Sequence, residues 1–338
     1  MSRPLLRCLA ALIAATMPVL ANADPIRLKF AYYAADTEEI WITTIRPFID
    51  AVNADAKGVI EIRPAVNGAL GPLAQQPQRV AEGGADMSFI VPDLTPDRFP
   101  DNAVIELPGL FADVREATLV ADRLIAAGKL RGFDNYFIIG ALGLVPASLH
   151  SRAPLATLED YAGKRVRASR TIEGRILQEL GVNVVSLPIG EAAQALAVGA
   201  IDGIFMAPIP LVDFGIAKYV RYHYFPNLGG AIAVLVMNRR LFDALPEAGQ
   251  DAMRKYSGDW ISERYVAGIA GFSEKILKDW RADPRQRLVQ PSAAETQRLQ
   301  ALYRIATNAV TADNPDAREL LAAIAAELGK LRKGPPGG

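Results

Sequence analysis

Cysteine is nearly absent from this chain of 338 residues, which contains only Cys8. Cys8 lies in the first 23 residues, MSRPLLRCLAALIAATMPVLANA, where two arginines precede an apolar run that ends at Ala-Asn-Ala. This pattern is typical of a cleavable secretory signal peptide, and the apolar run is shorter than the roughly 20 residues of a membrane span. We therefore expect a mature chain from Asp24 onward, without disulfides, whose destination is the periplasm.

Histidine is also scarce, with only His150 and His223 in the whole sequence. The chain has no His-Glu-x-x-His, no Gly-x-Ser-x-Gly, no Walker loop and no Gly-x-Gly-x-x-Gly, so the common zinc, hydrolase and nucleotide motifs are missing. We expect no metal and no cofactor, and we interpret both histidines as structural. An enzyme that uses one of them as a base is the weakest alternative.

The chain has no net charge, with 37 Lys and Arg against 37 Asp and Glu. Removal of the first 23 residues takes away two arginines and no acid, which leaves 35 basic against 37 acidic residues. Nucleic-acid-binding domains are typically strongly basic, so nucleic acid is not an expected partner. The local exception is GKRVRASR, residues 163–170, with four basic side chains in eight residues.

Apolar strands alternate with amphipathic helices along the chain, which predicts an α/β architecture. Residues 26–34, 59–66 and 85–91 have the composition of strands, and the same alternation recurs between residues 164 and 207. The C-terminal third is helical, and residues 247–283 show helical periodicity without a proline. A chain of this length is sufficient for two lobes.

One arginine of the basic segment is expected to reach a ligand. Arg165 and Arg167 share one face of the predicted strand, and Val166 and Ala168 take the other face. Ligands of open α/β sheets bind beyond the carboxyl ends of the strands, and a cleft between two lobes is the natural place for a small molecule. With no catalytic set present, a binding protein is the expected class.

Six segments together resemble a known family, the DctP-type solute-binding proteins of TRAP (tripartite ATP-independent periplasmic) transporters. They are NGALGP (67–72), VAEGGADMSF (80–89), RFPDNAVIELPGLF (98–111), LEDYAGKRVRAS (158–169), LPIGEAAQALAVGAIDG (187–203) and MNRRLFDALPEAGQDAM (237–253). The resemblance covers nearly the whole mature chain. It implies a periplasmic receptor that closes on a small organic acid and delivers it to a permease with a small and a large integral membrane subunit.

The resemblance also implies a two-lobed fold joined by crossing strands and a long helix. The first lobe is expected to contain residues 24–144 with a return at about 232–273, and the second to contain residues 145–231 with about 274–330. A signal peptide at 1–23 and a disordered tail at 331–338 complete the expected organisation. We expect a monomer.

The family's carboxylate-binding arginine corresponds to Arg167 in this chain. A guanidinium meets a carboxylate through two parallel hydrogen bonds, whereas Lys164, Arg165 and Arg170 are interpreted as surface charge. The further candidate ligand contacts, each with an alternative role in the core or in a turn, are Tyr33, Asn67, Asp93, Phe205, Met206 and Asp213.

The nature of the acid depends on two departures from the family pattern. Residues 204–207 are apolar where some members carry an asparagine, and Pro146 stands near the place of a second arginine. We therefore favour a monocarboxylate with an apolar or aromatic body. A dicarboxylate or a sugar acid is the alternative ligand, and presentation of the acid to a sensor is the alternative role.

Overall fold

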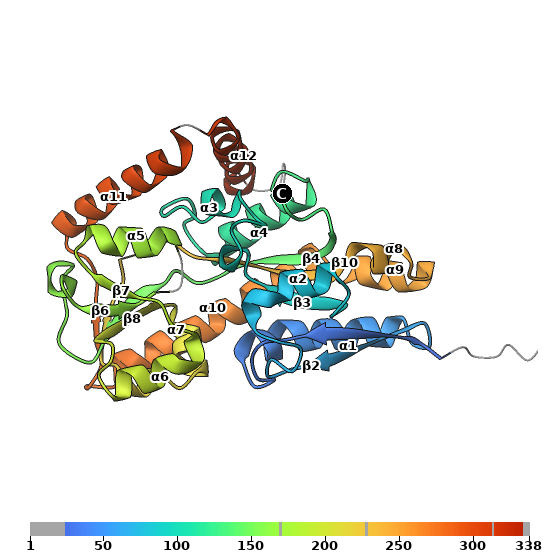
Figure 1. Ribbon diagram of the computed structural model, residues 1–338, viewed down its shortest axis with the longest axis horizontal. Coiled ribbons are helices and arrows are strands. Elements are labelled where there is room, and N and C mark those ends of the chain that lie inside the picture. Colours follow the sequence, from blue (N-terminus) through green and yellow to red (C-terminus); the bar gives the residue numbers. More distant parts are fainter. Residues whose placement is uncertain (1–23, 169–170, 227–228, 313, 334–338) are drawn as a thin grey trace, which may run out of the picture.

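The computed structural model describes residues 24–168, 171–226, 229–312 and 314–333. Two β-sheets lie side by side with helices packed around them, and one long helix runs past both sheets (Figure 1). The first sheet has the strand order β2-β1-β3-β10-β4, and the second has the order β11-β9-β5-β8-β6-β7. The predicted two-lobed α/β class is confirmed, and the predicted signal peptide lies outside the described residues.

The strands of the first sheet are β1 (Ile26–Ala31), β2 (Ile60–Ala65), β3 (Met87–Ile90), β4 (Tyr136–Gly143) and β10 (Ile232–Asn238). Those of the second are β5 (Ser148–Ser151), β6 (Arg165–Arg167), β7 (Asn183–Val185), β8 (Gly203–Met206), β9 (Tyr222–Tyr224) and β11 (Arg287–Val289). In the first sheet β1 is parallel to β2 and β3, and in the second β6 is parallel to β7 and β8. Each sheet therefore has one edge where several strands end.

The helices between these strands cover both faces of each sheet. In the first lobe they are α1 (Arg46–Asp55), α2 (Gln76–Ala81), α3 (Asn102–Ile105) and α4 (Val114–Ala126), and a π-helical turn, η1 (Trp41–Ile45), precedes α1. In the second they are α5 (Thr171–Glu179), α6 (Ile189–Ala197) and α7 (Pro208–Asp213). The later helices are α8 (Arg239–Asp243), α9 (Glu247–Lys255), α10 (Asp259–Ala282), α11 (Ala293–Thr311) and α12 (Pro315–Arg332).

Two strand crossings and helix α10 connect the lobes. The chain passes from β4 to β5 and returns from β9 to β10, which pairs antiparallel with both β3 and β4. Helix α10 has 24 residues, about 36 Å at the usual rise per residue. It packs on α4 and β4 of the first lobe and on α7 and β11 of the second. No described helix combines the length and the low polarity that a membrane crossing needs.

The C-terminal third departs from the expected organisation at two places. The segment 247–283 with helical periodicity forms two helices, because the chain breaks at Gly258, whose backbone has φ 62° and ψ −126°. A side chain strongly disfavours that conformation, so the glycine ends one helix and allows α10 to start in a new direction. Helix α12 packs on α3 and α4 of the first lobe rather than joining the second, and Arg332 forms an ion pair with Glu116. The helix thus continues into the expected tail, of which residues 334–338 lie outside the described residues.

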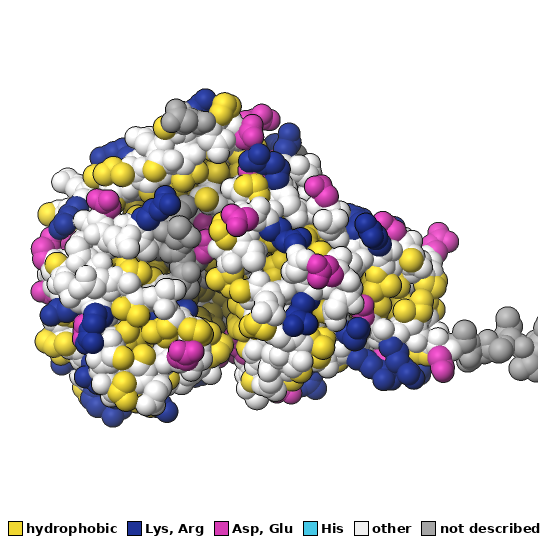
Figure 2. Space-filling model, in the orientation of Figure 1, with side chains coloured by type: hydrophobic (Ala, Val, Ile, Leu, Met, Phe, Trp, Pro, Cys, Tyr) yellow, Lys and Arg dark blue, Asp and Glu magenta, His cyan; other side chains and the backbone are white. Residues whose placement is uncertain are grey.

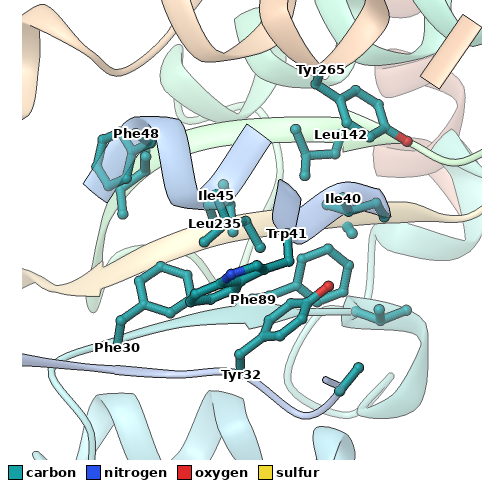
Figure 3. Close-up of a cluster of buried hydrophobic side chains, with 14 of the residues drawn as sticks. Phe30, Tyr32, Ile40, Trp41, Ile45, Phe48, Phe89, Leu142, Leu235 and Tyr265 are labelled. Atoms are coloured by element: carbon teal, nitrogen blue, oxygen red, sulfur yellow. The ribbon is translucent and has the colours of Figure 1, made fainter. Parts of the chain in front are cut away.

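An aromatic cluster under the first sheet supports the segment that follows β1. The ring centroids of Tyr32 and Trp41 lie 5.1 Å apart, those of Phe30 and Trp41 6.2 Å, and those of Tyr32 and Phe89 5.9 Å (Figure 3). The four side chains are at most 4% exposed. Tilted and edge-on rings at these separations pack favourably, so the backbone next to Tyr33 is firmly supported.

The two histidines form one buried network in the second lobe. They lie opposite each other on β5 and β9, with His150 Nδ1 2.7 Å from His223 Nδ1. His150 Nε2 lies 3.1 Å from the carbonyl oxygen of Met206, and His223 Nε2 lies 2.9 Å from Oε1 of Gln286. The His223 ring stacks on Trp280 of α10, with 3.9 Å between centroids. The histidines thus join the second sheet to the long helix.

The proton count of this network favours neutral rings. Because a carbonyl only accepts, His150 must carry its proton on Nε2, and its bare Nδ1 accepts from Nδ1–H of His223. A half-turn of the Gln286 amide then supplies an N–H to the remaining nitrogen of His223. Burial lowers the pKa of His150 well below its usual value and lowers that of His223 to about 4.

We predict that neither histidine titrates in the folded protein from about pH 8 to about pH 5.5. The unfolded chain takes up these protons near pH 6.5, so stability from the pair is complete above that value and falls as the pH drops toward about 4. Long-range ¹H–¹⁵N spectra would show two neutral rings, His150 protonated on Nε2 and His223 on Nδ1. Either ring titrating near pH 6.5 in the native state would contradict the prediction.

Candidate functional site

The parallel strands of the two sheets end at the cleft between the lobes. In the first lobe Tyr33 follows β1, Asn67 follows β2 and Asp93 follows β3; in the second, Arg167 ends β6 and Asp213 ends α7 beyond β8. In the space-filling view the surface is hollowed between the two bodies (Figure 2). The topology thus brings residues that are far apart in the sequence to the two sides of one cleft.

The basic segment 163–170 divides between surface and interior. Arg165 is exposed and bonds through Nη2 to Oδ1 of Asp202, 2.8 Å away. Arg167, two residues further along β6, is only 6% exposed, and its Nε donates to the carbonyl oxygen of Leu187 at 3.1 Å. Arg167 therefore brings a buried cation to the carboxyl edge of the second sheet, whereas Arg165 has an acidic partner at the surface. Arg170 lies outside the described residues.

The lobes meet at an aromatic pair. The ring of Tyr33, from the first lobe, stacks on the ring of Phe214, from the second, with 6.5 Å between centroids and 17° between planes. Tyr33 also packs on Phe89 at 5.6 Å. Both Tyr33 and Phe214 are half-buried, so this side of the cleft is lined by aromatic surface.

A buried carboxylate holds the tyrosine in place. Glu38 is 5% exposed and accepts hydrogen bonds from the hydroxyls of Tyr32 and Tyr33, the latter at 3.2 Å. Burial raises the pKa of Glu38, and the two tyrosine hydroxyls oppose that rise. The sequence alone did not predict this role of Glu38. The only local signal was the pair of tyrosines five and six residues upstream.

Asp213 faces that carboxylate from the other lobe. Burial, followed by the nearby charge of Glu38, raises the pKa of Asp213 to about 7, while the backbone N–H of Glu39 acts to lower it. Asp213 Oδ2 is buried and has no hydrogen-bond partner among the described residues. We call Tyr33, Glu38, Asp213 and Phe214 the interlobe contact.

The other candidate residues have different surroundings. Asn67 has φ 57° and an exposed side chain, as expected for a turn residue before Gly68. Asp93 is the middle residue of a short 3₁₀ turn, Pro92–Leu94, after β3. Met206 lies in the core shared with Tyr32 and Trp41 and is 6% exposed.

Phe205 differs from the expectation that it lines the cleft. It is 2% exposed and belongs to the core on the opposite face of β8, with Leu149 and Tyr224. Alternation along the strand explains the difference, since Ile204 and Met206 take the face toward the first lobe. Among the described residues no group of three metal-ligating side chains is placed to hold an ion.

Comparison with known proteins shows the family. The model of the DctP family, bacterial extracellular solute-binding protein family 7, matches residues 30–309. A solute-binding protein of Albidiferax ferrireducens is 23% identical over 331 residues, which cover 90% of this chain and 98% of that protein. The similarity therefore extends over almost the full length of that relative.

Solved structures share the fold. A TRAP solute-binding protein from an unidentified marine microbe, specific for aromatic acids and crystallised with 3-hydroxybenzoate, has a TM-score of 0.81 and 19% identity, over 91% of this chain and 99% of that one. A Bordetella pertussis extracytoplasmic solute receptor that binds pyroglutamic acid has a TM-score of 0.79 and 19% identity, over 88% and 99%. The chain described here belongs to the DctP family of bacterial extracellular solute-binding proteins, the family that its sequence segments resemble.

Proposed function

We propose that this chain is the periplasmic solute receptor of a TRAP transporter, which captures a small organic acid by its carboxylate and delivers it to a membrane permease. The observation that carries the proposal is Arg167, a nearly buried guanidinium at the carboxyl edge of the second sheet. The family supports a binding role. The two similar structures hold 3-hydroxybenzoate and pyroglutamic acid, and both ligands carry a carboxylate.

The chemistry is capture rather than turnover. The bond from Arg167 Nε to the Leu187 carbonyl helps to fix the plane of the guanidinium, a planar group whose N–H donors can meet a carboxylate through two parallel hydrogen bonds. In a cleft closed to water this charged pair favours an acid strongly over a neutral analogue, because the analogue leaves the arginine poorly paired. Closure of the lobes then traps the acid until the permease opens them.

The walls of the cleft favour an aromatic or apolar monocarboxylate. Tyr33 and Phe214 supply aromatic surface near the lobe boundary, with the buried ring of Phe89 packed behind Tyr33, and rings of a ligand pack well on such surfaces. Asn67 is exposed at the edge of the first sheet and would serve the second polar end of a dicarboxylate or sugar acid. A screen that includes both kinds of acid separates these ligands.

We predict that Arg167→Ala abolishes acid capture while Arg165→Ala leaves it intact. A thermal-shift screen of organic acids identifies the ligand, since a compound that binds only the folded state raises the melting temperature. Removing the buried half of a charged pair weakens binding by about 30-fold or more, a cost of about 2 kcal/mol or above. Isothermal titration calorimetry with the best acid measures the change.

The control variant sits two residues away on the same strand and loses a surface pair with Asp202 and a bond to the Gly199 carbonyl. Arg167→Lys keeps the charge without the planar fork and should bind with intermediate affinity. Full affinity in Arg167→Ala would disprove the assignment of the anchor. If only neutral compounds raised the melting temperature, the proposal that the ligand is a carboxylic acid would be disproved.

We further predict that two phenylalanines separate stability from binding. Phe205→Ala empties a core position and should cost about 3–5 kcal/mol in the free energy of unfolding, with affinity unchanged below the melting temperature. Phe214→Ala removes a half-buried ring and should cost only about 1 kcal/mol in stability while it weakens acid binding about tenfold. Denaturant unfolding and calorimetry on both variants check this. The reverse pattern would place the ligand on the other face of β8.

A further inference from the structure

The interlobe contact brings two carboxyl groups together from opposite lobes. Glu38 is held in the first lobe by two tyrosine hydroxyls, which donate to it and so stabilise its charge. Asp213 ends helix α7 in the second lobe, and its Oδ2 is buried without a partner among the described residues. The stacked rings of Tyr33 and Phe214 adjoin this pair, since Tyr33 bonds to Glu38 and Phe214 follows Asp213 in the chain.

Among the described residues, no cation contributes to the electrostatic environment of this pair. The charged groups that act on Asp213 are Glu38 and Glu39, both acidic, and Tyr32 and Tyr33 are the other titratable side chains facing it. Helix α10, which packs on α7, contributes apolar side chains such as Ile269 and Ile276 to the core that it shares with that helix. The backbone N–H of Glu39 is the polar group that offsets the acidity of this environment.

Two ionised carboxylates in one buried contact repel each other, and each loses its hydration. Separating the lobes removes both costs, because Asp213 then returns to water as an ordinary surface carboxylate. While the lobes are together, one proton on Oδ2 of Asp213 removes the repulsion. Oδ2 is the expected site because it has no hydrogen-bond partner among the described residues, whereas Glu38 accepts two hydrogen bonds that favour its ionised form.

We propose that closure of the two lobes takes up one proton from solvent, held on Oδ2 of Asp213 against Glu38, so that capture of the acid is linked to pH. This inference rests on the proposed receptor function for its biological meaning. The proton binds when the lobes meet and returns to solvent when they part, so no other reactant is needed. Closure is therefore favoured as the pH falls.

The sign and the range follow from Asp213. With the interlobe contact made, as in this structure, its pKa is raised to about 7, above the ordinary value of 3.8 expected when it is hydrated. Between these values the closed form carries the proton and the open form does not. The closed-to-open ratio should therefore rise about tenfold from about pH 8.5 to about pH 6, and should change little above pH 8.5.

The experiment uses the protein without any ligand. The mature chain has no cysteine, so Lys57→Cys on the first lobe and Val198→Cys on the second, both exposed, accept a pair of spin labels. Double electron–electron resonance then gives the fraction of molecules with the short interlobe distance at each pH. The expected result is a rise in that fraction that begins near pH 7 and continues as the pH falls further.

Matched variants assign the response to a residue. Asp213→Asn should keep the contact, remove the pH dependence and hold the closed fraction high throughout, because the amide mimics the protonated acid. Asp202→Asn is the control and should behave as the parent, since Arg165 lowers the pKa of Asp202 and it stays ionised over this range. Glu38→Gln should shift the onset of the rise to lower pH, because it removes a charge that raises the pKa of Asp213.

A closed fraction that does not change between about pH 8.5 and about pH 6, or a response that persists in Asp213→Asn, would overturn the proposal. Neither result touches the binding of acids by Arg167, which calorimetry measures separately. Conversely, a protein that binds no acid but closes on acidification would overturn the proposed function and leave the proton linkage standing.

Discussion

Two strand crossings and one helix hold the carboxyl edges of two sheets against a common cleft. Strand β10 pairs between β3 and β4, so the returning chain is built into the first sheet rather than attached to it. The hydroxyl of Tyr265 on α10 donates to the carbonyl oxygen of Gly143 at the β4 crossing, 2.9 Å away. We call these two crossings and α10 the frame. The residues at the cleft follow strand ends, so their positions depend on how the frame holds the two sheets.

Buried polar groups inside this frame bond across it to other segments of the chain. Glu38, His150 and His223 are almost fully buried, and each bonds to side chains or carbonyls from other segments of the chain. A buried polar group without such partners would lower the free energy of unfolding. These hydrogen bonds therefore determine which segments lie together, in addition to any stability that they contribute. In the first lobe the fixed segment carries Tyr33; in the second it joins β5 and β9 to α10.

Local patterns in the sequence predicted the elements that depend on local residues. The alternation of Arg165, Val166 and Arg167 correctly placed a strand, with one apolar face in the core. The sequence around Phe205 also alternates, which shows that Phe205 and Met206 lie on opposite faces of β8. It does not show which face is turned toward the cleft, because that depends on how the second lobe packs against the first. The break at Gly258 could not be inferred from periodicity alone, because the apolar spacing continues through it and the positive φ depends on tertiary packing.

Contacts between segments that are distant in the sequence could not be predicted from local patterns. Glu38 and Asp213 lie 175 positions apart in the numbering, and each taken alone has the signature of an ordinary helix-end acid. Their proximity follows from the crossing of the chain between lobes. The same holds for Arg332 and Glu116, whose pairing places α12 on the first lobe although its sequence is that of a generic amphipathic helix.

The position of α12 has a practical consequence for handling the molecule. Strand β1 opens the described chain in the first sheet, and α12 closes it on α3 and α4 of the same lobe. The second lobe is therefore inserted between two segments of the first lobe. A surface tether, a fluorescent fusion or a force probe attached at either terminus is carried by the first lobe, which leaves the second lobe unencumbered when the cleft opens or shuts.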